Sequence, residues 1–252
     1  MKFINQKVGI FFWRQVISCP LTFQKILQGL FFYFFKNPNL KRNIFSRKNI
    51  DVAFPNLNEK EKRNLFNKNT KSMVRGLFDT GKAWFWNDAK INSFLKYEIS
   101  GLDKLNSAKG NLLIFKHSHH LELDSRILGM HCELYGVERA HNSTYMQKVQ
   151  SAGRLRGLNA LADKNKPITF IKWLKRGKTV LYAIDQDYGL KNSINVDFFG
   201  VKTATTNAPI KIVDATQCNV LFLDSYYELD KLILSIEEVN ITDTQSMIQD
   251  IS

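Results

Sequence analysis

The chain has 252 residues, which is enough to bury one substantial hydrophobic core. Its 36 Lys and Arg residues against 23 Asp and Glu give a net charge of +13, which indicates an anionic partner. The anionic partner could be nucleic acid, an acidic membrane surface or an acidic carrier protein, and the net charge does not distinguish among them. The three cysteines, Cys19, Cys132 and Cys218, are isolated and odd in number, which argues against a disulfide framework and against a cysteine-based zinc motif.

The N-terminal segment is rich in Phe, Ile and Leu but is interrupted by Arg14, Pro20 and Lys25. A membrane-spanning helix needs about 20 mostly apolar residues, and no window here provides them. The segment therefore predicts one or two interfacial helices that end in an aromatic cluster at residues 30–35. No small-residue cleavage site follows, so we expect no removable signal peptide.

A basic cluster follows this aromatic segment, and its members are Lys36, Lys41, Arg42, Arg47 and Lys48. Basic residues beside an apolar anchor favour the cytoplasmic leaflet. We expect residues 1–48 to form a membrane-associated segment at the cytoplasmic face of the membrane, and residues 49–252 to form one further domain. The alternative is that the N-terminal helices belong to the core of a soluble protein.

The rest of the chain alternates helical and strand patterns. Asn58 and Glu61 predict a capped helix start, and the helix continues towards Trp84. Apolar runs predict strands at 97–99, 112–115, 134–137, 180–184, 220–223 and 232–236, and helical patterns fall near 120–130, 144–156, 168–176 and 204–216. The fold class that we predict is α/β, with a mixed, largely parallel sheet flanked by helices.

The most informative stretch runs from Lys109 to Glu122. Its apolar run at 112–115 predicts a buried strand, which places His117 at the carboxyl end of that strand, where ligands bind in open α/β sheets. Glu122 falls in the first turn of the next helix. A turn between the two elements can fold the carboxylate back onto the imidazole, which would give a general base with an orienting partner. A core histidine and a carboxylate at a helix N-terminus are the plain alternative.

This segment resembles the catalytic His-x4-Glu segment of the lipid A late acyltransferases, within the lysophospholipid acyltransferase superfamily. Other stretches are similar to that family in the same order: Asn49 to Pro55, Thr80 to Trp86, Gly153 to Arg156, Tyr182 to Gly189, Phe198 to Gly200 and Ala204 to Thr206. The resemblance is closest to the lauroyltransferase branch. Family members typically continue with a C-terminal helical segment containing a Pro-Glu-Gln-Tyr-like stretch, and this sequence lacks it.

The resemblance implies an acyltransferase in lipopolysaccharide biosynthesis at the inner membrane. It would move a fatty acyl group from acyl carrier protein to a hydroxyl of a Kdo-lipid A precursor, without a metal, a cofactor or nucleic acid. His117 and Glu122 would be catalytic. The expected substrate-binding residues are Arg126, Arg139, Arg154, Arg156, Asp185 and Asp187. The alternative is structural: the arginines would form a solvated basic face, and the aspartates would belong to a polar turn.

Three other readings remain open at this stage. The neighbouring His119 and His120 resemble part of a metal-ligand cluster, although no second group of His and Asp supplies the other ligands. A glycerolipid or other lysophospholipid acyltransferase would share the His-x4-acid site but should carry a Pro-Glu-Gly-Thr-like segment where residues 185–189 lie. A degenerate, membrane-bound remnant of the family would share the fold but would not catalyse acyl transfer.

Overall fold

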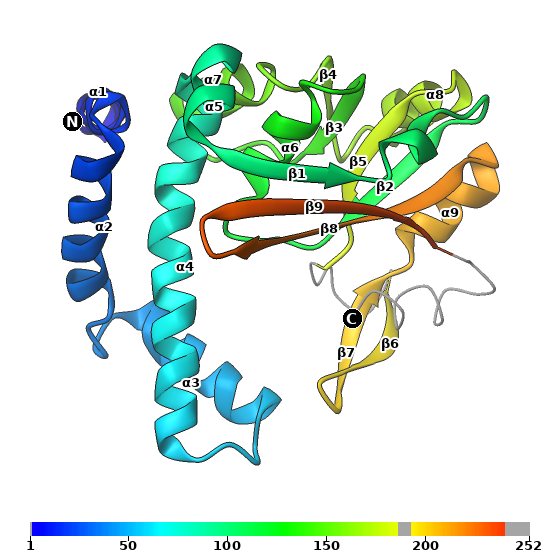
Figure 1. The fold of residues 1–252 in the computed structure, drawn as a ribbon. Coiled ribbons are helices and arrows are strands. Elements are labelled where there is room, and N and C mark those ends of the chain that lie inside the picture. Colours follow the sequence, from blue (N-terminus) through cyan, green and yellow to red (C-terminus); the bar gives the residue numbers. More distant parts are fainter. Residues whose placement is uncertain (1, 186–192, 240–252) are drawn as a thin grey trace.

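The computed structural model describes residues 2–185 and 193–239. These residues form a central sheet that is flanked by helices (Figure 1). The helices are α1 (Lys2–Ser18), α2 (Leu21–Phe35), α3 (Lys41–Ala53), α4 (Glu59–Phe85), α5 (Asp88–Phe94), the 3₁₀ turn η1 (Leu102–Leu105), α6 (Leu121–Leu128), α7 (Thr144–Arg154), α8 (Pro167–Lys175) and α9 (Ala208–Thr216). The strands are β1 (Lys96–Ser100), β2 (Asn111–Phe115), β3 (Leu134–Glu138), β4 (Ala160–Asp163), β5 (Thr179–Ala183), β6 (Ser193–Phe198), β7 (Val201–Thr206), β8 (Asn219–Glu228) and β9 (Lys231–Glu238).

The main sheet has seven strands in the order β1-β9-β8-β2-β5-β3-β4. Every neighbouring pair is parallel except β8 and β9, which form an antiparallel hairpin. The predicted α/β class with a mixed, largely parallel sheet is therefore confirmed. Strands β6 and β7 form a separate two-stranded hairpin.

Strand β2 occupies the centre of the sheet, and all five of its residues are buried. Leu113 and Phe115 pack into one core cluster, which includes residues of α4 and α6. Leu112 and Ile114 face the opposite cluster, which includes residues of α8 and α9. Burial on both faces explains the unbroken apolar run in the sequence. Each such side chain contributes about 1.5–3 kcal/mol by leaving water.

Helix α4 is 27 residues long and begins with the predicted capping box. The Asn58 side chain accepts hydrogen bonds from the N–H groups of Lys60 and Glu61, and Glu61 accepts one from the Asn58 N–H. Near its other end, the Trp86 indole donates to the carbonyl of Ile17, whose side chain is fully buried. Helix α1 is therefore packed into the core of the α/β domain.

The sequence-based boundaries were wrong in one region. Residues 204–206, expected to be helical, belong to β7, and α9 begins only at Ala208. Pro209 near the start of α9 is compatible with the first helical turn, whereas the Thr-rich run before it favours a strand. Strands β4, β6 and β7 were not predicted. Strand β4 has only four residues, whereas β6 alternates polar and apolar residues, a strand signal that was overlooked.

No helix within residues 2–185 and 193–239 combines the length and the apolar character needed to cross a membrane. Helix α3 contains both residue 48 and residue 49, so the expected boundary between the two segments falls within one helix. The division into a membrane-associated segment and a further domain stays a prediction.

Candidate active site

His117 and Asp185 meet because β2 and β5 are parallel neighbours in register. Phe115 and Ala183 are the last residues of these strands and lie opposite each other. His117 and Asp185 each follow two residues later. One carboxylate oxygen of Asp185 lies 2.5 Å from Nδ1 of His117, and the other accepts the His117 backbone N–H at 2.7 Å. Asp185 thus holds both the main chain and the ring of His117. Asp185 engages Nδ1, and Nε2 is the second ring nitrogen, which in an imidazole can also carry or accept a proton.

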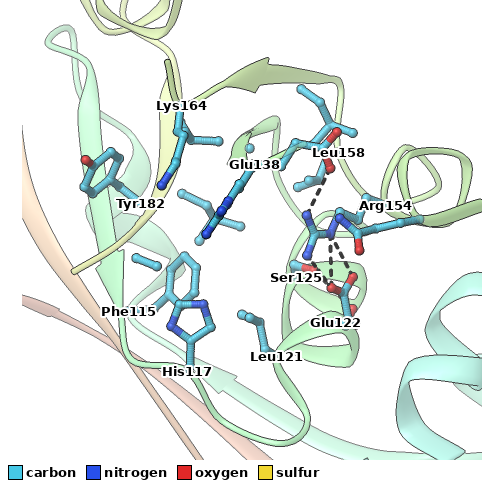
Figure 2. A pocket seen from close by; sticks show the side chains of 17 residues that line it. Phe115, His117, Leu121, Glu122, Ser125, Glu138, Arg154, Leu158, Lys164 and Tyr182 are labelled. Atoms are coloured by element: carbon cyan, nitrogen blue, oxygen red, sulfur yellow. Dashed lines mark hydrogen bonds and ion pairs between the residues drawn. The ribbon is translucent and has the colours of Figure 1, made fainter. Parts of the chain in front are cut away.

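Glu122 lies in the same pocket but binds other partners (Figure 2). Its carboxylate accepts hydrogen bonds from Trp84 Nε1 at 2.9 Å and from Arg154 Nη2 at 2.6 Å. Among the described residues there is no hydrogen bond between Glu122 and the His117 ring. The expected pairing of Glu122 with His117 is therefore wrong for this structure, because Trp84 and Arg154 draw the carboxylate to the far side of the pocket.

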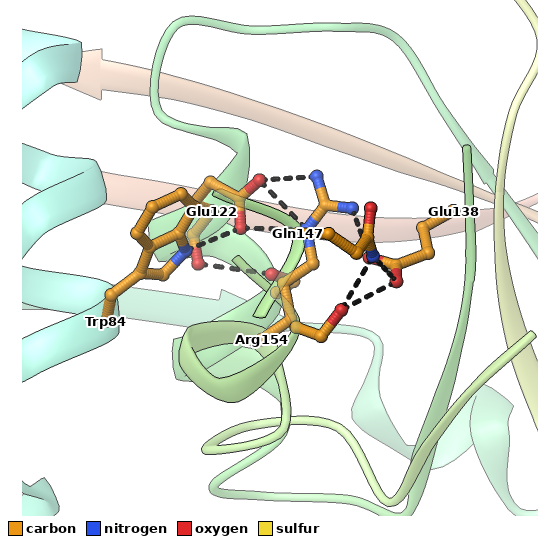
Figure 3. Close-up of polar contacts among 7 residues, drawn as sticks. Trp84, Glu122, Glu138, Gln147 and Arg154 are labelled. Carbon is orange, nitrogen blue, oxygen red and sulfur yellow. Dashed lines mark hydrogen bonds and ion pairs between the residues drawn. The ribbon is translucent and has the colours of Figure 1, made fainter. Parts of the chain in front are cut away.

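Arg154 is held between two carboxylates (Figure 3). Its Nε and Nη2 donate to Glu122, and its Nη1 donates to Glu138 at 3.0 Å. Glu138 also accepts hydrogen bonds from Gln147 at 2.6 Å and Ser151 at 2.8 Å. This network joins α4, α6, β3 and α7. The guanidinium fork is occupied on both sides, so Arg154 is fixed within the wall of the pocket.

Two shifted pKa values follow from these contacts. Burial alone would raise the pKa of Asp185, but the hydrogen bonds from the His117 ring and backbone hold it below its ordinary value. Burial alone would lower the pKa of Arg154, but the hydrogen bonds to Glu122 and the charges of Glu122 and Glu138 hold it above its ordinary value. Both groups are therefore ionised at neutral pH.

The pocket between these groups has a volume of about 200 Å³. It lies at the carboxyl ends of β2, β3 and β5, and α6 and α7 also contribute to its wall. Apolar side chains such as Leu121 and Leu181 share this wall with His117, Glu122 and Arg139. Placing a reactive histidine at the carboxyl edge of a parallel sheet is the usual arrangement in open α/β folds. The predicted position of His117 is confirmed.

The other predicted substrate-binding residues divide into distinct groups. Arg139 is exposed and lines the pocket. Arg126 is buried and forms an ion pair with Asp88, and its Nε has no partner among the described residues. Arg156 is exposed and donates to the carbonyl of Trp86 at 2.9 Å. Neither Arg126 nor Arg156 lines the pocket, so the structure does not bring either to the site. Asp187 lies outside the described residues.

Sequence reasoning missed the roles of Glu138 and Trp84, and it placed Asp185 with the substrate instead of with the histidine. Glu138 is the last residue of β3, so its position at a strand end was the available signal. Trp84 is the second-last residue of α4, and no spacing rule relates it to Glu122. Lys164, just beyond β4, is a further cationic residue of the pocket wall that was not predicted.

The neighbouring histidines turn towards separate partners. His119 Nε2 lies 3.1 Å from Asn69 Oδ1, and His120 Nδ1 lies 2.9 Å from a carboxylate oxygen of Asp124. Within the part of the chain that the structure describes, no three His, Cys, Asp or Glu side chains gather as a metal site would require. The metal-cluster reading of these histidines therefore has no geometric support in that part of the chain.

The model of the family described as bacterial lipid A biosynthesis acyltransferase matches residues 2–248. The chain belongs to this family. Among its relatives, a lipid A biosynthesis acyltransferase of Haemophilus influenzae is 31% identical over 83% of this chain and 68% of its own length. A lipid A biosynthesis palmitoleoyltransferase of Escherichia coli is 34% identical over 66% of this chain and 56% of its own length.

A lipid A biosynthesis lauroyltransferase of Escherichia coli is 36% identical over 63% of the chain. The matched part is 53% of that enzyme, so this chain spans between about half and two thirds of these relatives. The crystal structure of the 1-acyl-sn-glycerophosphate acyltransferase PlsC from Thermotoga maritima aligns with 90% of this chain and 92% of that chain, at a TM-score of 0.41 and 14% identity. The family match confirms the expected family, and with it the class of enzyme, an acyltransferase of lipid A biosynthesis.

Proposed function

We propose that this protein transfers a fatty acyl group from acyl carrier protein to a hydroxyl of a Kdo-lipid A precursor. The observation that carries the proposal is the His117–Asp185 pair beside a pocket with both apolar and charged walls, in a chain of the lipid A acyltransferase family. The names of the relatives support an acceptor of the lipid A type. The net charge of +13 suits an acidic carrier protein and a phosphorylated lipid.

In the proposed mechanism, Nε2 of His117 takes the proton of the acceptor hydroxyl as its oxygen attacks the thioester carbonyl carbon. Asp185 holds Nδ1–H and stabilises the imidazolium that forms. When the tetrahedral intermediate collapses, the C–S bond breaks and the imidazolium returns its proton to the leaving thiolate. No acyl-enzyme intermediate is needed. General-base catalysis of this kind contributes about 10²–10⁴-fold.

The negative charge that develops on the carbonyl oxygen needs a donor. Arg139 lines the pocket and is the candidate cation, and backbone N–H groups of the turn at Ser118 are candidate neutral donors. Glu122 has a supporting role in this scheme, because its charge is matched by Arg154 and its oxygens are engaged by Trp84 and Arg154. It fixes the wall that faces His117.

The decisive experiment measures transfer of a labelled lauroyl group from acyl carrier protein by the purified full chain. A tetra-acylated Kdo-bearing acceptor and lysophosphatidic acid are offered in separate reactions. We expect acylation of the Kdo-bearing acceptor and a loss of at least about 10²-fold in His117→Ala. Acylation of lysophosphatidic acid alone would establish the glycerolipid alternative. No transfer to either acceptor by a folded chain would support the non-catalytic remnant.

We also propose that α1, α2 and α3 attach the protein to the cytoplasmic face of the inner membrane. Large apolar side chains of these helices are exposed, among them Phe11, Phe12, Ile26, Tyr33 and Phe34. Large exposed apolar side chains beside basic residues are typical of helices that attach to the interface of anionic lipid. This localisation rests on exposure and charge.

Point substitutions test this attachment better than truncation, because Ile17 of α1 is buried in the core and removal of α1 would expose that core. We expect the full chain to float with vesicles that contain anionic lipid. The double variant Phe12→Asp and Phe34→Asp should stay in the lipid-free fraction at the bottom of the gradient. Equal flotation of the folded double variant would contradict attachment through these residues.

A further inference from the structure

A second hollow lies between α3 and α4, outside the pocket at His117. Its volume is about 720 Å³, and its apolar wall consists of Phe45, Ile50, Ala53, Phe54 and Leu65. The hollow is broad and open to solvent, so this volume is that of a surface groove and not of an enclosed cavity. The hollow, hereafter the α3–α4 groove, is therefore large enough for part of a lipid, whereas the pocket at His117 is smaller.

The groove reaches the turn that carries the candidate base. Asn69 of α4 lines the groove, and its Oδ1 lies 3.1 Å from Nε2 of His119, two residues beyond His117. The same side chain donates from Nδ2 to Ser46 Oγ of α3 at 3.2 Å. Asn69 therefore connects the wall of the groove with the catalytic turn. A ligand lying in the groove would have one end near that turn.

The polar side of the groove is positive. Arg42, an exposed residue at the start of α3, lines it. Burial lowers the pKa of His119, and the charge of Arg42 lowers it further, so the field of Arg42 reaches the catalytic turn. Lys41 and Lys48 are exposed on the same helix. An apolar wall with this charge is complementary to an amphiphile with an anionic head group.

Two segments singled out in the sequence meet beside the groove. Phe54 belongs to the stretch from Asn49 to Pro55, and Phe199 belongs to the Phe198 to Gly200 stretch at the turn of the β6–β7 hairpin. Their ring centroids lie 5.1 Å apart. Phe199 remains half exposed. The hairpin projects from the main sheet (Figure 1), and the contact between Phe199 and Phe54 brings its turn next to the groove.

We propose that the α3–α4 groove is a subsite that holds an acyl chain of the anionic lipid acceptor, while the hydroxyl of that acceptor reaches His117. This inference rests on the proposed function and names the place where the acceptor chain lies. The exposed apolar side chains of Ile44 and Phe45 on α3 provide a route into the groove from a lipid surface. The groove shares no lining residue with the pocket at His117, so the acyl donor can react in that pocket while the acceptor chain lies in the groove.

The test places tryptophan at two adjacent positions of α3. Ala53 lines the groove and is partly buried, whereas Val52 is 58% exposed and does not line it. We expect Ala53→Trp to raise the KM for the Kdo-bearing acceptor by at least about tenfold, since excluding two methylene groups from an apolar site already has that effect. The KM for lauroyl-acyl carrier protein should stay unchanged. The matched control Val52→Trp should alter neither constant.

Binding of dodecyl phosphate, measured by calorimetry on the full chain, separates this inference from the proposed function. Dodecyl phosphate should bind the parent and Val52→Trp equally and bind Ala53→Trp at least about tenfold more weakly. That pattern supports the groove even if the parent transfers no acyl group. Equal acceptor KM values, or equal dodecyl phosphate affinities, for folded Ala53→Trp and Val52→Trp proteins would overturn it.

Discussion

Replacing Asp185 by Asn tests the central contact of the site. The change keeps the size of the side chain but removes its charge and one of its two acceptors. Because Asp185 accepts both the backbone N–H and the ring Nδ1–H of His117, an amide at this position satisfies only one of them. The ring is then free to adopt the wrong tautomer, and the imidazolium loses its counter-charge.

The expected loss follows from the geometry. Two unit charges about 4 Å apart interact by about 4 kcal/mol at an effective dielectric constant near 20. The side chains of His117 and Asp185 are 38% and 36% exposed, so we reduce the interaction to about 2 kcal/mol, or about 30-fold in rate. Adding the tautomer effect gives an expected fall in kcat of about 10²-fold. An Asn at the buried orienting aspartate of a serine-protease triad sets an upper limit of about 10⁴-fold.

The assay is single-turnover transfer from lauroyl-acyl carrier protein, with Asp214→Asn on the surface of α9 as the matched control. Because the pKa of Asp185 lies below its ordinary value, Asp185 is ionised in the parent from about pH 6 to pH 8, and the proteins are compared within this range. A folded Asp185→Asn protein with kcat within about threefold of the parent would refute the role assigned to Asp185.

Three further predictions concern the surroundings of the pair. A double-mutant cycle with Glu122→Gln and Arg154→Gln should give a coupling of about 1–3 kcal/mol in the free energy of unfolding, because the two groups form a half-buried ion pair. Gly76→Ala should cost about 1–3 kcal/mol, since its Cβ would lie 2.2 Å from the carbonyl oxygen of His119. Arg42→Gln should raise the pKa of His119 in an NMR titration, although burial should keep that pKa below its ordinary value.

Each of these predictions has a distinct check. Additive effects at Glu122 and Arg154 would contradict the ion pair. Gly29→Ala is the control for Gly76, because nothing lies within 4 Å of a Cβ added at Gly29. For His119, a lowered folded pKa means that the unfolded chain binds the proton more tightly. Its contribution to stability is therefore complete above about pH 6.5 and decreases as the pH falls towards the folded pKa.

Much of the fold could be predicted from local pattern alone. The apolar run of β2 and the capping box of α4 are encoded within a few residues, and both were located correctly. The position of His117 followed from the same run. Local pattern could not identify the partner of His117. Glu122, only five residues away, was the carboxylate that local spacing suggested, whereas the observed partner Asp185 is 68 residues away. Only the adjacency of β2 and β5 brings Asp185 to the ring.

Sequence spacing also could not show which cations remain available to a substrate. Arg126 and Arg154 both lie in segments that resemble the family, yet both are taken up by carboxylates within the fold. Arg139, by contrast, forms no ion pair among the described residues and lines the pocket. Lys164 lies in the same pocket wall. Arg42 contributes positive charge at the α3–α4 groove. A substrate with phosphate groups at one end and acyl chains at the other would therefore meet positive charge at both hollows. His117 lines one of them, and His119, two residues further on, contacts Asn69 at the other.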